Sequence, residues 1–284
     1  MKLKSKISLV TTAIAGFALA ISAGELAEKG RAVFKQHQRE VVTVQVVQKM
    51  SYSSGGRTSE PQETKQDITG TVVDPSGLTV LALSACDPSE MIKRMYPTYK
   101  VDAEVSDVKI LLEDGTEIAS EIVLRDKDLD LAFIRPKTKL AAPMAAVDLS
   151  KAVTAQVLDE LITINRLGRA AGRAHAASIE HVSAVVQKPR TFYIPDSAQT
   201  ATALGSPAFA LDGNIVGILV MRTINSGGGG SMNNFRPDNA TSIVLPAEDI
   251  AKAAKQAPEA KGEEPKKEEA KEAPKAAKPE AEKK

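Results

Sequence analysis

Short apolar stretches separated by turn-forming residues run through the middle of this chain. Val41 to Gln48 has the sequence VVTVQVVQ, in which β-branched residues favour an extended strand. Asp74 to Gly77 (DPSG) places Pro and Gly where a β-turn needs them, and the pairs Asp114-Gly115 and Asp212-Gly213 also separate apolar runs. The pattern therefore predicts hairpins. The expected strands cover residues 41–48, 69–73, 78–83, 108–113, 116–124, 129–134, 161–164, 179–186, 208–211, 214–220 and 241–245.

Helical patterns flank this region. One helix is expected around Glu25 to Gln38, and Pro246 opens a second, with Glu248 and Asp249 in its first turn, where the helix dipole favours anions. The strands fall into two groups, roughly 40–137 and 150–247, without alternation of strands and helices. This arrangement predicts an all-β fold of two antiparallel units, each a barrel or a sandwich.

Composition narrows the class of protein. The 284 residues include 43% hydrophobic residues, enough for a sizeable core. A net charge of +1 argues against nucleic-acid binding through bulk charge, and 4% aromatic residues without Trp argue against a base-stacking or sugar-stacking surface. The single cysteine, Cys86, excludes an intrachain disulfide and a Cys-based zinc cluster. We expect no cofactor, no metal and no nucleic-acid partner.

The two ends differ from the middle. Residues 1–23 have three lysines among the first six residues, followed by an uncharged apolar run that ends in small residues. This is the pattern of a secretory signal peptide. An uncleaved membrane anchor is the alternative, because the run is just long enough to span a bilayer. Residues 253–284 are almost entirely Ala, Lys, Glu and Pro, so we expect a disordered tail after a domain that covers residues 24–252.

Four stretches, in order and at matching spacing, resemble the trypsin-like serine proteases of the bacterial HtrA/Deg type. Gly70 to Ser84 (GTVVDPSGLTVLALS) resembles the family's strand, turn and strand that leads to its His. Asp126 to Ile134 (DKDLDLAFI) resembles the run that holds its Asp. Leu204 to Ile218 (LGSPAFALDGNIVGI) resembles its nucleophile segment, and Ile243 to Ile250 (IVLPAEDI) its last strand and terminal helix. The resemblance implies two six-stranded antiparallel β-barrels with a site between them, and no segment resembles the PDZ domains of HtrA proteins.

The catalytic residues of that family do not carry over intact. Its mechanism needs a Ser nucleophile, a His base and an Asp that orients the His. The family's His lies seven residues after the turn glycine, and this chain has Ser84 seven residues after Gly77. The family's nucleophile lies nine residues before the hairpin glycine, and this chain has Leu204 nine residues before Gly213. Only Asp130 matches. The resemblance therefore implies a protease fold whose triad is degenerate.

Two further consequences concern the backbone and the remaining carboxylate. Thr202 stands where the family has a Gly two residues before the nucleophile, which places its oxyanion hole in doubt. In the family the Asp is shielded and bonded to the His. Here Asp130 needs other donors, and we expect the Ser84 hydroxyl and nearby backbone N–H groups to supply them.

Other residues could in principle replace the triad. The three histidines, His37, His175 and His181, are far from Ser84 in sequence. Ser206 lies two residues past the nucleophile position, where a tight turn points a side chain elsewhere, so we interpret it as a turn residue. Cys86 lies in an apolar stretch and is expected to be a buried small hydrophobe.

Three functions stay open at this stage. The first is an exported, periplasmic or secreted, non-catalytic homologue that binds a protein or peptide, with a homo-oligomer as a further option. The second is a working serine endopeptidase. The third is an envelope scaffold protein whose C-terminal tail is a spacer.

Overall fold

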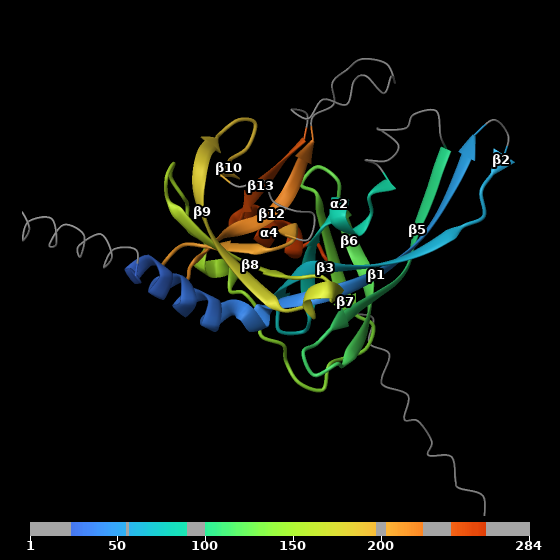
Figure 1. Cartoon of the computed structure of the whole chain (residues 1–284), viewed down its shortest axis with the longest axis horizontal. Coiled ribbons are helices and arrows are strands. Elements are labelled where there is room, and N and C mark those ends of the chain that lie inside the picture. The colour runs from blue at the N-terminus through green and yellow to red at the C-terminus, as the bar shows by residue number, and fades with distance from the viewer. Residues whose placement is uncertain (1–23, 55–56, 90–99, 197–202, 224–239, 260–284) are drawn as a thin grey trace, which may run out of the picture.

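The computed structural model describes residues 24–54, 57–89, 100–196, 203–223 and 240–259. Within them the chain forms two closed antiparallel barrels of six strands each, which Figure 1 shows side by side. The all-β prediction of two six-stranded barrels is therefore confirmed. The first barrel comes from the N-terminal group of strands and the second from the C-terminal group, without exchange of strands between them.

The first barrel closes because one long strand pairs on both of its edges. Strand β1 bonds to β3 along one edge and to β5 along the other, so the strands β1-β3-β4-β7-β6-β5 close into a ring of six. The short strand β2 pairs only with the end of β1. The strands of this unit are β1 (Val41–Ser54), β2 (Arg57–Thr58), β3 (Gln62–Asp74), β4 (Leu78–Ala82), β5 (Lys100–Leu111), β6 (Glu117–Asp126) and β7 (Leu131–Pro136).

The second barrel has the closed order β10-β13-β12-β11-β8-β9. Its strands are β8 (Glu160–Arg166), β9 (His175–Val186), β10 (Phe192–Pro195), β11 (Pro207–Phe209), β12 (Ile215–Thr223) and β13 (Ala240–Pro246). A helix over residues 24–37 precedes the first strand. The other helical elements are η1 (Gln38–Glu40), α2 (Leu83–Cys86), η2 (Leu149–Lys151), η3 (Arg169–Ala171) and α4 (Ala247–Ala254).

The predicted turns and end helices are present. Gly77, Gly115 and Gly213 all have positive φ, at 92°, 86° and 83°, and each follows the strand that the hairpin pattern placed before it. Pro246 precedes the first turn of α4, as expected. The prediction was wrong at Leu83, which does not end a strand but begins the short helix α2. It also missed strand β10, whose four residues are too few to show a period.

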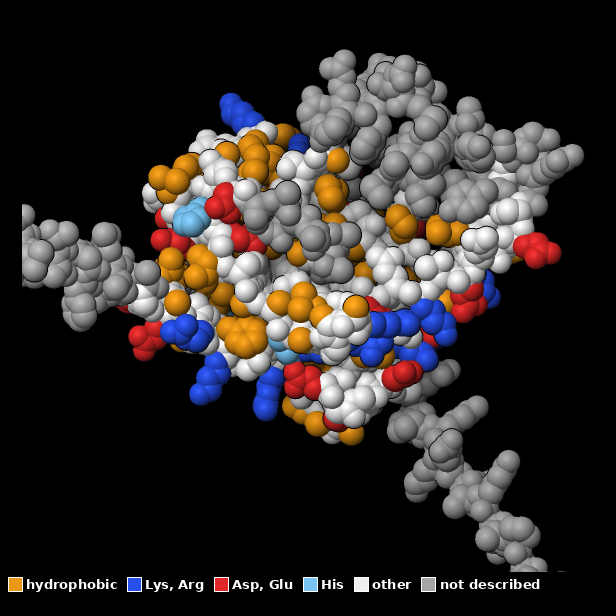
Figure 2. Space-filling view, in the orientation of Figure 1, with side chains coloured by type: hydrophobic (Ala, Val, Ile, Leu, Met, Phe, Trp, Pro, Cys, Tyr) orange, Lys and Arg blue, Asp and Glu red, His pale blue; other side chains and the backbone are white. Residues whose placement is uncertain are grey.

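The core is continuous across the two barrels. The largest apolar cluster combines first-barrel residues such as Phe133 with second-barrel residues such as Leu204, Ile218 and Val220. A separate cluster fills the second barrel around Tyr193, and a third lies under the N-terminal helix. Because one apolar cluster contains side chains from both barrels, burial of apolar area holds the barrels together. Charged side chains of both signs lie on the outside, as Figure 2 shows for one face of the molecule.

The packed domain extends beyond the boundary expected from composition. Ala253 and Ala257 are buried in the shared core, and the Arg135 guanidinium donates to the Pro258 carbonyl at 2.7 Å. The expected tail boundary at residue 253 is thus too early. Residues 260–284, and the predicted signal peptide at 1–23, lie outside the described residues. Within the described ranges no helix is long and apolar enough to cross a membrane.

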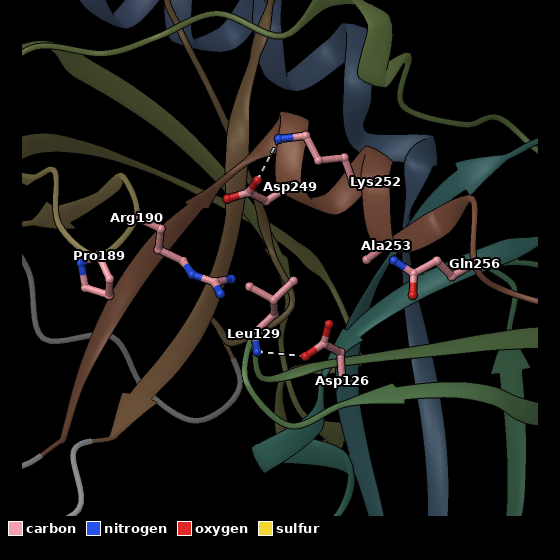
Figure 3. A pocket seen from close by; sticks show the side chains of 8 residues that line it. All are labelled: Asp126, Leu129, Pro189, Arg190, Asp249, Lys252, Ala253 and Gln256. Atoms are coloured by element: carbon pink, nitrogen blue, oxygen red, sulfur yellow. Dashed lines mark hydrogen bonds and ion pairs between the residues drawn. The ribbon is translucent and has the colours of Figure 1, made fainter.

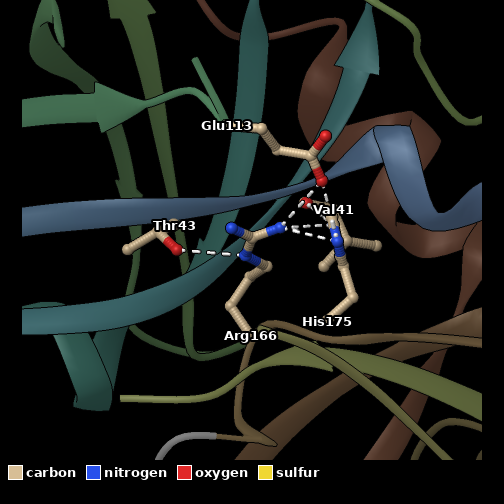
Figure 4. Close-up of polar contacts among 5 residues, drawn as sticks. All are labelled: Val41, Thr43, Glu113, Arg166 and His175. Atoms are coloured by element: carbon tan, nitrogen blue, oxygen red, sulfur yellow. Dashed lines mark hydrogen bonds and ion pairs between the residues drawn. The ribbon is translucent and has the colours of Figure 1, made fainter. Parts of the chain in front are cut away.

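A polar junction around Arg166 also joins the barrels (Figure 4). This β8 side chain is buried, and its Nε donates to the Thr43 hydroxyl of β1 at 3.1 Å. The His175 Nε2 donates to the Val41 carbonyl at 3.0 Å. Its Nδ1 lies 2.7 Å from Arg166 Nη1 and 3.0 Å from a carboxylate oxygen of Glu113, which completes the group from the exposed side. Burial, the largest cause, lowers the pKa of His175.

Replacing Arg166 should weaken the contact between the barrels. We expect Arg166→Ala to lower the free energy of unfolding by about 2–3 kcal/mol, because it removes charged hydrogen bonds at a buried position. Urea denaturation measures the loss. Arg169→Ala is the matched control: its side chain is 52% exposed and pairs with Asp67, so about 1 kcal/mol or less is expected. Equal losses in the two variants would contradict the junction's role.

Candidate functional site

The candidate site is centred on Asp130, in the turn between β6 and β7. The Asp126 carboxylate accepts from the backbone N–H groups of Asp128 and Leu129, both at 3.0 Å, which fixes this turn. Asp130 itself has a backbone φ of 57°, which is uncommon for a residue other than Gly. Its carbonyl accepts from the Leu83 N–H at 2.8 Å, so its backbone is also held against α2.

The Asp130 carboxylate accepts three hydrogen bonds. The Ser84 backbone N–H donates to Oδ1 at 2.7 Å, and the Ser84 hydroxyl donates to Oδ2 at 2.8 Å. The Met221 N–H of β12 donates to Oδ2 at 2.7 Å. The predicted pairing of Asp130 with Ser84 is confirmed. The Met221 donor was missed, because a backbone N–H leaves no mark in the sequence.

Burial dominates the electrostatics of this carboxylate. It raises the pKa of Asp130 to about 6, while the hydrogen bonds from Met221 and Ser84 act in the opposite direction. Among the described residues no Lys, Arg or His forms an ion pair with it. At neutral pH the group is therefore an ionised carboxylate held by neutral donors.

Leu204 lies near β12, the strand of Met221, but its side chain provides no reactive group. Its side chain is 3% exposed and belongs to the shared core. The following Gly205 N–H donates to the Leu219 carbonyl at 2.7 Å, two residues from Met221 along β12. The structure thus brings Ser84, Asp130 and the segment after Leu204 to one strand.

The backbone of the nucleophile segment fits tightly between the barrels. Gly205 has a φ of 89°, and a Cβ at this position would lie 2.4 Å from the Thr69 carbonyl oxygen. The Thr71 hydroxyl donates to the Gly205 carbonyl at 2.8 Å. Only Gly satisfies both the conformation and the space. Thr202, the residue that placed the oxyanion hole in doubt, lies outside the described residues.

The remaining candidates do not join this site. Cys86 is fully buried, and burial raises the pKa of its thiol to about 12. The thiol therefore stays protonated at neutral pH, which agrees with the prediction of a small buried hydrophobic residue. His37 stacks on Phe209 with ring centroids 4.0 Å apart, and His175 belongs to the Arg166 junction. His181 pairs with Asp196 on the surface at 3.0 Å.

Ser206 lies between Gly205 and the first residue of β11, Pro207. It is fully buried, and its hydroxyl has no hydrogen-bond partner. Its N–H donates to the Ala203 carbonyl at 3.2 Å and closes the turn over residues 203–206, which supports its interpretation as a turn residue. Across the described ranges no group of three acidic, His or Cys side chains is arranged to hold a metal ion.

The turn that carries Asp130 also lines a pocket of about 330 Å³ (Figure 3). Asp126 and Leu129 come from the first barrel, Arg190 from the loop before β10, and Asp249 and Lys252 from α4. Lys252 pairs with Asp249 at 3.1 Å. Both barrels thus contribute side chains, of both charges, next to the candidate site. Pro189, Ala253 and Gln256 complete the lining.

The double barrel, with a carboxylate between its halves, defines a trypsin-like fold. Comparison with protein families agrees: residues 68–218 match the trypsin-like peptidase domain, and the chain belongs to that family. The match runs from β3 into β12 and includes positions 84, 130 and 204. No curated protein matches the sequence closely.

The free energy of unfolding should depend on pH through the carboxyl group of Asp130. Because the pKa of Asp130 rises to about 6 on folding from its ordinary 3.8, the folded state holds a proton there that the unfolded chain has lost. Its contribution is then most favourable below pH 4 and is lost as the pH rises through 6. Relative to Asp130→Asn, the wild type should lose about 2 kcal/mol of unfolding free energy between pH 4 and pH 7.

Urea denaturation at several pH values measures this difference. Asp128→Asn, two residues away on the exposed turn, is the matched control and should keep the wild-type pH profile. A profile of Asp130→Asn that runs parallel to the wild type would show that Asp130 titrates normally.

Proposed function

We propose that this protein is an exported, non-catalytic homologue of trypsin-like serine proteases, of the HtrA type, that acts by binding a protein or peptide. The observation that carries the proposal is the bond between Ser84 and Asp130 at 2.8 Å, together with the burial of Leu204. The one surviving triad residue is thereby used in packing.

The chemistry of the site supports the loss of catalysis. Leu204 has no nucleophilic atom, and a serine hydroxyl at position 84 has no useful basicity near neutral pH. Removal of triad members leaves at most about 10³ to 10⁴-fold acceleration over water, and that remainder depends on an intact oxyanion hole. A serine endopeptidase would need another nucleophile and base, and neither Cys86 nor Ser206 is exposed.

The fixed backbone around Asp130 and Gly205 supports a role in binding a protein or peptide. The close fit of Gly205, the Thr71 hydrogen bond and the turn of Asp130 hold the region between the barrels in one geometry. The adjacent pocket combines side chains from both barrels. Concave sites between structural units are where small ligands and peptide side chains commonly bind.

The protein should not hydrolyse peptide bonds by a serine mechanism. With unfolded casein at high protein concentration we expect no turnover above background, and the same background for Asp130→Asn. A serine-reactive fluorophosphonate probe should leave both proteins unlabelled. Turnover or labelling in the wild type that disappears in Asp130→Asn would establish a working triad and overturn the proposal.

Binding separates the proposed function from a scaffold role. We expect immobilised peptides of varied sequence to capture the protein, and capture to survive deletion of residues 261–284. A scaffold whose tail is its functional part would lose its partners on that deletion. Absence of peptide capture by both forms would contradict the binding function.

Export rests on the composition of residues 1–23. We expect the mature protein to begin near Ile21 or Gly24, and to be found in the periplasm or outside the cell. Mass spectrometry of the protein purified from its own cell envelope determines the first residue. An intact Met1 would instead favour the membrane-anchor alternative.

A further inference from the structure

We propose that Asp130 is the receptor for a cationic side chain, the guanidinium or ammonium group of an Arg or Lys in the ligand. This inference rests on the proposed binding function and names the chemistry of its ligand. The feature behind it is a carboxylate between the barrels that accepts from three neutral donors and, among the described residues, pairs with no cation.

The hydrogen bonds leave part of the carboxylate free. Two ionised carboxylate oxygens can accept about four hydrogen bonds, and Asp130 accepts three. Oδ2 takes both the Ser84 hydroxyl and the Met221 N–H, so the remaining capacity lies on Oδ1 beside the Ser84 N–H. Asp130 and Ser84 are both only partly buried. Both residues thus keep part of their surface exposed, and the cation of the ligand is proposed to approach from that side.

Among the described residues, the elements that donate hydrogen bonds to Asp130 place no cation on its carboxylate. Helix α2 has the sequence LSAC and carries no ionisable cation. Strand β12 carries one, Arg222, and its guanidinium carbon lies 4.8 Å from the centre of the Phe192 ring rather than on the carboxylate. The turn over residues 126–130 carries three carboxylates, Asp126, Asp128 and Asp130, and one cation, Lys127. The charge of the turn is therefore negative, and among the described residues no cation forms an ion pair with Asp130.

A partly buried anion without a cation is costly, and a ligand cation would offset that cost. A guanidinium or ammonium group gains a charge-assisted hydrogen bond that the neutral donors around Asp130 do not provide. Neutral side chains of the same size gain only an ordinary hydrogen bond. The site therefore discriminates by charge, which is the property that the experiment measures.

The test uses methylguanidinium as the probe and N-methylurea as its neutral counterpart of similar shape. Carboxyl ¹³C NMR of the full chain follows the titration of Asp130. We expect methylguanidinium to lower the pKa of Asp130 by about one unit at saturation, since a nearby cation favours the ionised form. N-methylurea should leave it unchanged. No shift with methylguanidinium, or equal shifts with both probes, would overturn the proposal.

Two variants keep the test decisive. Asp130→Asn removes the charge, and methylguanidinium binding, followed by amide NMR at Ser84 and Met221, should be lost. Ser84→His keeps Asp130 but places an imidazole beside it, so the probe's effect on the Asp130 titration should also be lost. Asp128→Asn is the control and should retain the full effect. A probe effect that persists in Ser84→His would place the cation elsewhere and contradict the proposal.

Peptide capture distinguishes this inference from the proposed function. Among captured peptides, replacing each Lys by acetyl-lysine and each Arg by citrulline should weaken binding about tenfold, equivalent to about 1.4 kcal/mol. If the modified peptides bind as tightly as the unmodified ones, the result supports the binding function and overturns the cation site. A methylguanidinium response without any peptide capture supports the cation site and overturns the binding function.

Discussion

One carboxylate, that of Asp130, connects the parts of this structure that define its site. Its backbone belongs to a turn of the first barrel, its side chain accepts two hydrogen bonds from α2, and a third comes from β12 of the second barrel. The geometry of the turn, of the helix and of the strand must agree within hydrogen-bond tolerance for all three to form. The position of Asp130 therefore constrains how the two barrels meet.

The residues at the two positions that the proposed alignment assigns to the triad His and Ser fit their surroundings physically. Serine at position 84 is short enough for its hydroxyl to donate to the Asp130 carboxylate at 2.8 Å. Leucine at position 204 adds apolar area to the core shared by the barrels. Both residues suit the folded state, at a site whose backbone is constrained by Gly205. On the proposed function, the same two residues therefore stabilise the fold and leave the site without a nucleophile and a base.

The sequence predicted those parts of the structure that local chemistry determines. Turn residues such as Asp74 and Gly77 identified hairpins because only a few residue types adopt these backbone angles. The partners of Asp130 on α2 were predictable because a buried carboxylate must be bonded. Strand β10 and the extension of β1 to Ser54 were not predictable, because they depend on pairing with distant strands. The Met221 N–H has the same origin: barrel closure places it, whatever its side chain.

The most direct measurement concerns an imidazole introduced beside Asp130. In Ser84→His, NMR titration of the new ring should give a pKa at least one unit higher than in Ser84→His combined with Asp130→Asn, since only the first retains the carboxylate. The difference between these two proteins isolates the effect of Asp130 from that of burial. Equal pKa values would show that positions 84 and 130 do not face each other as a catalytic pair would, and would contradict the account of this site.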